Sequence, residues 1–265
     1  MSYYVQKHGV IIPKDIREKI SFRYHKVTKS INKEFWMINS DELHSFYVGS
    51  YGRGTAIKSS DLDILVQLPE SEYYRYDSHK GNGQSRLLQA VKNAILIAYP
   101  NSNISADGQI VKIDFSDGIN FEILPAFQNN NVFTYPDTNK GGRWRSTNPK
   151  AEQKAMFDLN KLSNNLLFDT CKHIRKIRDT KFSNGYLSGI VIDSFVFASI
   201  GNWHWCTEGE LSTHPIGSYE KYLYKQAEVI DRAFYDVLFA PGSKLQVSYS
   251  DSIHTLKEVL NYMAY

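Results

Sequence analysis

The sequence has few of the features that mark secreted or membrane-spanning proteins. It contains only two cysteines in 265 residues, Cys171 and Cys206, and neither forms a Cys-x-x-Cys pair or a Cys/His ligand set. Two isolated cysteines exclude a disulfide scaffold and a structural zinc site, so we expect two reduced thiols. The longest mostly apolar stretch, residues 194–206, is interrupted by polar residues and is too short to span a bilayer.

The chain also lacks a large surplus of charge. Its 31 basic and 28 acidic residues give a formal net charge of +3, spread along the sequence. A protein that grips long nucleic acid usually carries a stronger basic excess, so we expect no stable nucleic-acid binding. The first twenty residues have no apolar core typical of a signal peptide, and we therefore expect a cytoplasmic protein without a membrane partner. The 42% of hydrophobic residues suffices for one large domain or two lobes.

Hydrophobic periodicity predicts a sheet with flanking helices in the first half of the chain. Apolar residues recur at helical spacing after Pro13, and they alternate in the runs that we interpret as strands. The turn signal Ser116-Asp117-Gly118 joins two such runs into a β-hairpin. The expected elements are a helix at 13–36, strands at 45–48 and 61–68, a helix at 87–98, and a hairpin formed by 109–115 and 119–127.

The second half of the chain is expected to be helical almost to its end. Residues 128–149 are rich in Asn, Gly, Pro and Thr, which predicts a long loop and a lobe boundary. The fold class is therefore α+β, with an N-terminal lobe at 1–149 that carries helix 13–36 and a small mixed sheet, and a helical lobe at 150–265. The helices expected in the second lobe are one from residue 150 and others at 166–179, 187–203, 218–239 and 252–263.

The residues most suggestive of chemistry lie around the two strands at 45–48 and 61–68. Gly49 and Ser50 follow the first strand, where backbone N–H groups, a hydroxyl and the absence of a Cβ would suit a triphosphate. Asp61 and Asp63 are one residue apart on the second strand, so their side chains share a face. Such a pair could hold two magnesium ions about 4 Å apart, as in two-metal phosphoryl transfer.

A third carboxylate on a neighbouring strand would complete this site. Glu122 is the first choice, because Phe121 and Ile123 form the apolar face of its strand and leave Glu122 on the polar face. Asp114, on the other hairpin strand, also lies on a polar face and competes for the role. The register of the hairpin decides between the two acids.

The order of Gly-Ser, Asp-x-Asp and a distal acid resembles the DNA polymerase β-like nucleotidyltransferases. The segments GSYGRGTAIKSSDLDILVQLP, FEILPAF, RWRSTNP, LSGIVIDSFVF and FAPGSKLQV are similar to bacterial SMODS-type nucleotidyltransferases, the cGAS/DncV-like synthases of cyclic oligonucleotides called CD-NTases. The likeness runs from about Tyr47 to the C-terminus. It implies a bilobed enzyme in which Asp61, Asp63 and Glu122 bind the metals and act in catalysis, while Gly49 and Ser50 bind phosphate.

The resemblance has further implications for the helical lobe and for function. Lys172, in CKHIRKIRD, would reach the triphosphate, and Ser188, in the LSG segment, would contact it. The sequence departs from the family where an aromatic residue and a lysine are common, since Ile177 and Arg178 stand there. The family implies Mg²⁺, which Mn²⁺ can replace, NTP substrates including ATP, and pyrophosphate release. It also implies bacterial anti-phage (CBASS) signalling through a separate effector that the cyclic di- or trinucleotide product activates.

Several alternatives accompany this reading. A transferase of the same superfamily could instead modify RNA, a protein or a small molecule such as an aminoglycoside. A non-catalytic nucleotide-binding relative would be expected to have lost its acids, and here every acid position is filled. Arg53 could contact a phosphate or could be an ordinary solvated loop arginine. Trp203, His204 and Trp205 are assigned to the core, because one His/Cys pair is too few ligands for zinc.

Overall fold

The computed structural model describes residues 4–58, 61–207, 209–232 and 237–265. Contacts divide the chain into two compact units. The sheet unit comprises 12–52 and 59–148, and the helical unit comprises 1–11, 53–58 and 149–265. The division into lobes at 1–149 and 150–265 stays a prediction.

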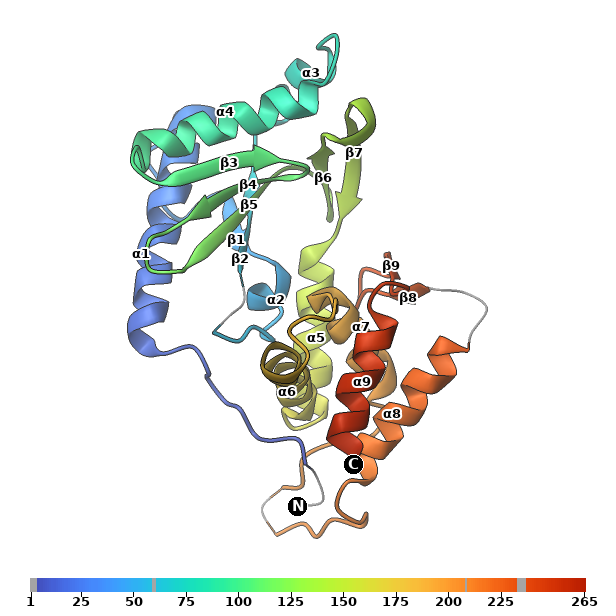
Figure 1. Cartoon of the computed structure of the whole chain (residues 1–265). Helices are drawn as coiled ribbons and strands as arrows, with labels where there is room; N and C mark the ends of the chain where they lie inside the picture. Colours follow the sequence, from blue (N-terminus) through green and yellow to red (C-terminus); the bar gives the residue numbers. More distant parts are fainter. Residues whose placement is uncertain (1–3, 59–60, 208, 233–236) are drawn as a thin grey trace. The chain divides into compact units, whose positions relative to one another are not determined.

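The sheet unit is built on a mixed β-sheet (Figure 1). Its strand order is β1-β2-β5-β4-β3, and β6 and β7 extend it from the end of β5. The β2–β5 pair is parallel and the other pairs are antiparallel. The strands are β1 (Ser45–Tyr47), β2 (Leu62–Gln67), β3 (Asn103–Asp107), β4 (Ile110–Asp114), β5 (Asn120–Asn129), β6 (Val132–Asp137) and β7 (Arg143–Thr147).

Helix α4 (Gly83–Ala98) lies along β3 and β4 and packs against α1 (Lys14–Ile31), as Figure 1 shows. A short π-helix at Asn32–Trp36 extends α1. The apolar stripe of α4, which includes Leu87, Leu88 and Val91, is fully buried, so helix periodicity and burial agree. The unit also contains α2 (Gly49–Gly52) and α3 (Glu70–Asp77).

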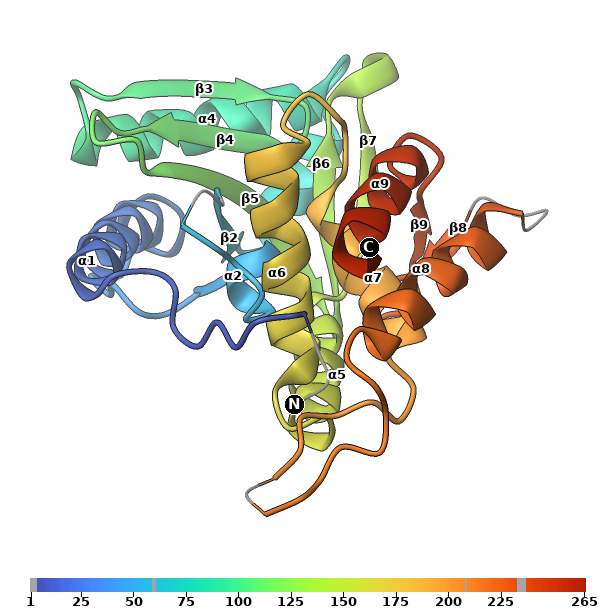
Figure 2. The same cartoon turned by 60° about the horizontal axis from the view of Figure 1, so that its bottom comes forward.

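The helical unit is formed mainly by five helices within the described residues (Figure 2). Its core is a large cluster of apolar side chains, centred on the nearly all-apolar helix α7. A short antiparallel pair of strands, β8 (Val237–Phe239) and β9 (Gln246–Ser248), completes the unit. The helices are α5 (Pro149–Leu162), α6 (Leu166–Lys181), α7 (Gly189–Ser199), α8 (Ser218–Asp231) and α9 (Ile253–Ala264). In the described part of the chain, no helix is both long and apolar enough to cross a membrane.

The expected helices and the hairpin of the first half are confirmed, but two expectations for the rest of the chain are wrong. Residues 128–149 are not a long loop, because β6, β7 and the end of β5 occupy most of them. The Asn- and Gly-rich pieces are tight turns, with left-handed backbone at Asn130 and Lys140. The helix expected at 218–239 ends at Asp231, and 237–239 form a strand, while 233–236 lie outside the described residues.

The predicted free thiols are confirmed, with Cys171 buried and Cys206 partly buried. The assignment of the nearby aromatic segment to the core is confirmed for Trp205, which is 2% exposed, and Trp203 packs against the same core. It is wrong for His204, whose exposed ring contacts Glu210 instead. His204 lies in the loop after α7, where a polar ring can remain in water while its apolar neighbours pack.

Candidate active site

Two of the predicted acids lie side by side at the centre of the sheet. Asp63 on β2 and Glu122 on β5 are direct partners in the parallel register. Their carboxyl groups share a hydrogen bond. Asp61 precedes β2, and Asn120 Nδ2 donates to its Oδ1 at 3.2 Å. Asn120 and Glu122 are two residues apart on one strand, so the same face of β5 serves both aspartates.

Burial and neighbouring charge act together on Glu122. Burial raises the pKa of Glu122, and the negative charges of Asp63 and Asp61 raise it further, to about 7. Lys112, its direct partner on β4, opposes this shift only in part. Three carboxylates at close range cannot all be ionised cheaply without a counter-charge. The site is therefore a place where a cation would be strongly favoured.

The hairpin register separates Glu122 from its competitor Asp114. Asp114 lies opposite Asn120 on β4, one strand further from β2. Its carboxylate accepts a hydrogen bond from Asn103 Nδ2 at 3.1 Å and lies 3.9 Å from Lys112 Nζ. Glu122, and not Asp114, thus lies beside Asp63. The role of Glu122 as a metal ligand stays a prediction.

The Gly49-Ser50 turn lies against the same acids. Val48 alone separates β1 from the four residues of α2. Val48 N donates to Asp63 O at 2.9 Å, and this hydrogen bond links the turn to β2. Gly49 has a left-handed backbone with φ of +57°. A Cβ at Gly49 would overlap the Asp63 carboxylate and would lie 2.8 Å from Asp63 Cβ. Glycine is therefore required here by both backbone conformation and space.

The other two predicted phosphate-binding residues belong to the helical unit. Lys172, on α6, donates from Nζ to the Gly9 carbonyl at 2.7 Å, and burial lowers the pKa of Lys172. Ser188 is the N-cap of α7, and its hydroxyl accepts a hydrogen bond from Val191 N at 3.4 Å. Both residues thus have local structural contacts. Their approach to a triphosphate stays a prediction.

The sequence suggested that Arg53 either contacts a phosphate or is a solvated loop arginine, and the structure shows a third arrangement, a buried ion pair. Its side chain is buried, and it donates from Nε to Asp193 Oδ2 at 2.9 Å and from Nη1 to Glu152 Oε2 at 3.1 Å. The sequence reasoning missed this pairing. A signal was present, because Asp193 stands within the apolar helix GIVIDSFVFAS, and a buried carboxylate needs a cationic partner.

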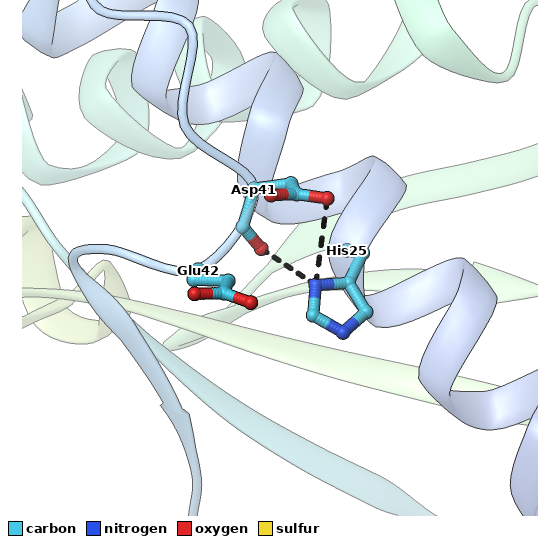
Figure 3. A group of neighbouring side chains, drawn as sticks. All are labelled: His25, Asp41 and Glu42. Atoms are coloured by element: carbon cyan, nitrogen blue, oxygen red, sulfur yellow. Dashed lines mark hydrogen bonds and ion pairs between the residues drawn. The ribbon is translucent and has the colours of Figure 1, made fainter.

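A different group of side chains resembles a metal site but does not form one. His25 lies on α1, and Asp41 and Glu42 lie in the loop before β1 (Figure 3). His25 Nδ1 is 2.9 Å from the Asp41 carbonyl, which can only accept, so Nδ1 carries the proton and has no lone pair for a metal. In Figure 3, the other ring nitrogen points away from both acids. The hydrogen bond between His25 and the Asp41 carbonyl therefore holds the loop before β1 against α1.

Glu122→Gln should stabilise the metal-free protein at pH 8 and leave it nearly unchanged at pH 4. Because the folded pKa is raised, the folded state binds more protons than the unfolded state between about 4.5 and 7, so the stability from this group falls as pH rises through that window. The neutral amide removes the penalty above pH 7. We expect the Tm in EDTA to rise by about 2–4 °C at pH 8.

Differential scanning fluorimetry of wild type and variant at each pH measures this difference, and the contributions of other groups cancel within each pair. Asp114→Asn, on the neighbouring strand, is the control and should show no such gain. Equal Tm values for Glu122→Gln and wild type at pH 8 would contradict the carboxylate crowding.

Comparisons with known proteins place this geometry in a family. The SMODS domain, described as a Second Messenger Oligonucleotide or Dinucleotide Synthetase domain, matches residues 7–160, which is more than half of the chain. This match covers the Gly49-Ser50 turn and all three acids. No curated protein matches the chain significantly.

Solved structures similar to this chain are CD-NTases. The Elizabethkingia meningoseptica CdnE cyclic dinucleotide synthase, solved with GTP and Apcpp, has a TM-score of 0.62 at 14% identity, over 100% of this chain and 96% of that one. The Rhodothermus marinus CdnE c-UMP-AMP synthase has a TM-score of 0.61 at 13% identity, over 96% and 91%. A STING-associated CdnE c-di-GMP synthase from Capnocytophaga granulosa has a TM-score of 0.63 at 14% identity, over 93% and 80%.

At such low identity these structures establish the fold, which is the expected polymerase β-like α+β fold with a mixed sheet and helices. The domain match establishes more, because it is a match of sequence across the residues that carry the motifs. The chain belongs to the SMODS family of nucleotidyltransferases, which synthesise cyclic oligonucleotides.

Proposed function

We propose that this protein joins NTPs into a cyclic di- or trinucleotide and releases pyrophosphate at each step. The observation that carries the proposal is the contact of the Gly49 turn with Asp63, next to Glu122. A turn free of Cβ atoms suits a triphosphate, and the adjoining acids suit the reacting phosphorus. The similar structures support NTP substrates, since one of them holds GTP and Apcpp.

The acids fit a divalent cation, and we propose Mg²⁺, with Mn²⁺ as a substitute. The donor set of Asp61, Asp63 and Glu122 consists of carboxylate oxygens, which are the ligands that Mg²⁺ and Mn²⁺ prefer. The raised pKa of Glu122, caused first by burial and then by Asp63 and Asp61, is consistent with this proposal, because Lys112 offsets only part of the negative charge. When bound, the cation would neutralise charge on the phosphate oxygens and on the attacking and leaving oxygens.

The side chains have distinct tasks in the proposed reaction. A ribose hydroxyl of one NTP attacks the α-phosphorus of another, so that one P–O bond forms as the P–O bond to pyrophosphate breaks. With the cation bound, Glu122 would be an ionised ligand beside the attacking hydroxyl, and a carboxylate of this group or solvent water would accept the hydroxyl proton. The backbone of Gly49 and Ser50 would hold the triphosphate in line. A second transfer within the linear product closes the ring.

The test is a reaction of the purified chain with the four NTPs, singly and in all pairs, with Mg²⁺ or Mn²⁺. We expect a phosphatase-resistant product with the mass of a cyclic di- or trinucleotide, and one pyrophosphate for each bond formed. The Asp61→Ala/Asp63→Ala variant should yield neither. Absence of product from wild type in every mixture, or transfer of α-phosphate label to added RNA or protein, would refute the proposal.

We also propose that the product acts in anti-phage (CBASS) signalling in the bacterial cytoplasm, through a separate effector. The support is the family, whose members are second messenger synthetases. Nucleotide extracts from cells that express the chain, taken before and after phage challenge, test this role. The cyclic product should accumulate after challenge, and cells with the Asp61→Ala/Asp63→Ala variant should lose protection.

A further inference from the structure

The segment 53–58 belongs to the helical unit, although the chain on both sides of it belongs to the sheet unit. Thr55, Ala56 and Ile57 are at most 8% exposed. Gly54 has φ of +78°, and a Cβ there would lie 2.5 Å from the ring of Phe168 on α6. This short connector is therefore packed into the helical unit and is not an exposed loop.

Asp193 on α7 is the polar centre of this packing. Its Oδ2 accepts hydrogen bonds from Arg53 Nε at 2.9 Å and from Thr55 Oγ1 at 3.0 Å. Its Oδ1 accepts from Arg175 Nη1 at 2.7 Å. The Asp193 side chain has no solvent exposure, so these charge-assisted bonds replace hydration entirely.

Other donors of the two arginines bind further groups of the helical unit. Arg53 Nη1 reaches Glu152 on α5, and Ser243 donates to the other oxygen of that carboxylate at 3.3 Å. Arg175 Nη2 donates to the Gly189 carbonyl at 2.9 Å. Burial alone would raise the pKa of Asp193, but Arg175 and Arg53 hold it below its usual value. The network is thus an ionised and well-satisfied group that fixes Arg53 and Thr55 in place.

The connector joins the two halves of the candidate active site. Gly52, the last residue of the Gly49-Ser50 turn, precedes Arg53 directly, and Asp61 follows Lys58 by three residues. We propose that the Asp193 network positions the phosphate-binding turn and the Asp61/Asp63 strand for nucleotidyl transfer by fixing the connector between them. Arg53 and Thr55 are then positioning residues, which act through the backbone and do not touch substrate. The kinetic part of this proposal rests on the proposed function, because it requires a measurable rate of nucleotidyl transfer.

A purely structural network would give a different result from a positioning network. In the first case, variants lose stability, but the folded molecules turn over normally. In the second, kcat falls in fully folded protein while the KM for NTP changes less, because a misplacement of about 1 Å can cost about 100-fold in rate. The distinction therefore requires variants that remain folded. Asp193→Asn is less suitable, because it removes the negative charge that two buried arginines share and is expected to destabilise the fold strongly.

Arg53→Lys and Thr55→Val are the test variants. Lysine keeps the charge but cannot reach both Asp193 and Glu152 as the planar guanidinium does. Valine matches the shape of Thr55 and lacks only the hydroxyl. Thr55→Ser keeps the hydroxyl and removes only the methyl group, so it is the control for Thr55→Val. Glu220→Gln is the control for a buried polar change elsewhere in the helical unit, because Glu220 is buried and binds the Tyr4 and Val5 amides and not the connector.

At a temperature where every variant is folded, we expect kcat to fall about 10- to 100-fold in Arg53→Lys and about 10-fold in Thr55→Val. Thr55→Ser and Glu220→Gln should remain within about threefold of wild type. Hydrogen exchange of the amides at 49–52 and 61–63 should be faster in the two test variants only.

Unchanged kcat in Arg53→Lys and Thr55→Val, or equal exchange in all variants, would overturn the proposal. If wild type makes no product, the proposed function fails, and the exchange measurement still decides whether the network positions the turn and the strand.

Discussion

Asp63→Asn should reduce the rate of cyclic nucleotide synthesis about a thousandfold without unfolding the protein. Asp63 contacts the Gly49 turn, pairs with Glu122 across the β2–β5 ladder and shares a hydrogen bond with it. An amide keeps the size of the side chain but removes a negative charge from the proposed cation site. Loss of several kcal/mol of charge stabilisation, about 4 kcal/mol, corresponds to about a thousandfold in rate.

The measurement is pyrophosphate release at saturating NTP and Mg²⁺, together with the Tm in EDTA. Asp114→Asn is the matched control, since Asp114 lies on the same sheet one strand away and is bound to Asn103. Its rate should stay within a few-fold of wild type. If the Asp63 and Asp114 variants lose activity equally, the acids of β2 are not the reacting centre.

Local sequence patterns predicted most of the sheet unit. Helices α1 and α4, strand β2 and the β4–β5 hairpin each depend on a period of hydrophobic residues, or on a turn residue such as Gly118, that a few neighbouring positions define. The Asn- and Gly-rich residues 128–149 misled the composition argument. Turn residues mark both loops and tight turns between strands, and only the pairing of β6 with β7 tells them apart.

The candidate site was predictable in part for the same reason. Asp61 and Asp63 share a face because of the strand period, but the choice between Glu122 and Asp114 depended on which strand pairs with β2. That pairing brings together residues 59 positions apart, beyond any local pattern. The role of Arg53 depended on a still more distant partner, Asp193, with which it forms a buried ion pair.

Gly49→Ala should reduce synthesis at least about 100-fold, although it adds only one methyl group. The left-handed backbone at Gly49 costs a non-glycine residue roughly 1–2 kcal/mol. The added Cβ would also overlap the Asp63 carboxylate and press against Asp63 Cβ, so either Asp63 or the turn must move. Both belong to the proposed reacting centre, where a displacement of about 1 Å is expected to cost about 100-fold.

Gly108→Ala separates these two effects. Gly108 is in the β3–β4 turn with φ of +60°, nearly the same as Gly49, but a Cβ there would have nothing within 4 Å. It should therefore lose a similar amount of stability from backbone strain and keep nearly all of its activity. Rates and Tm values of both variants, measured side by side, decide the point. Equal activity in the two variants would mean that the contact between the turn and Asp63 does not matter for the reaction, whereas a loss confined to Gly49→Ala would locate the reaction at this contact.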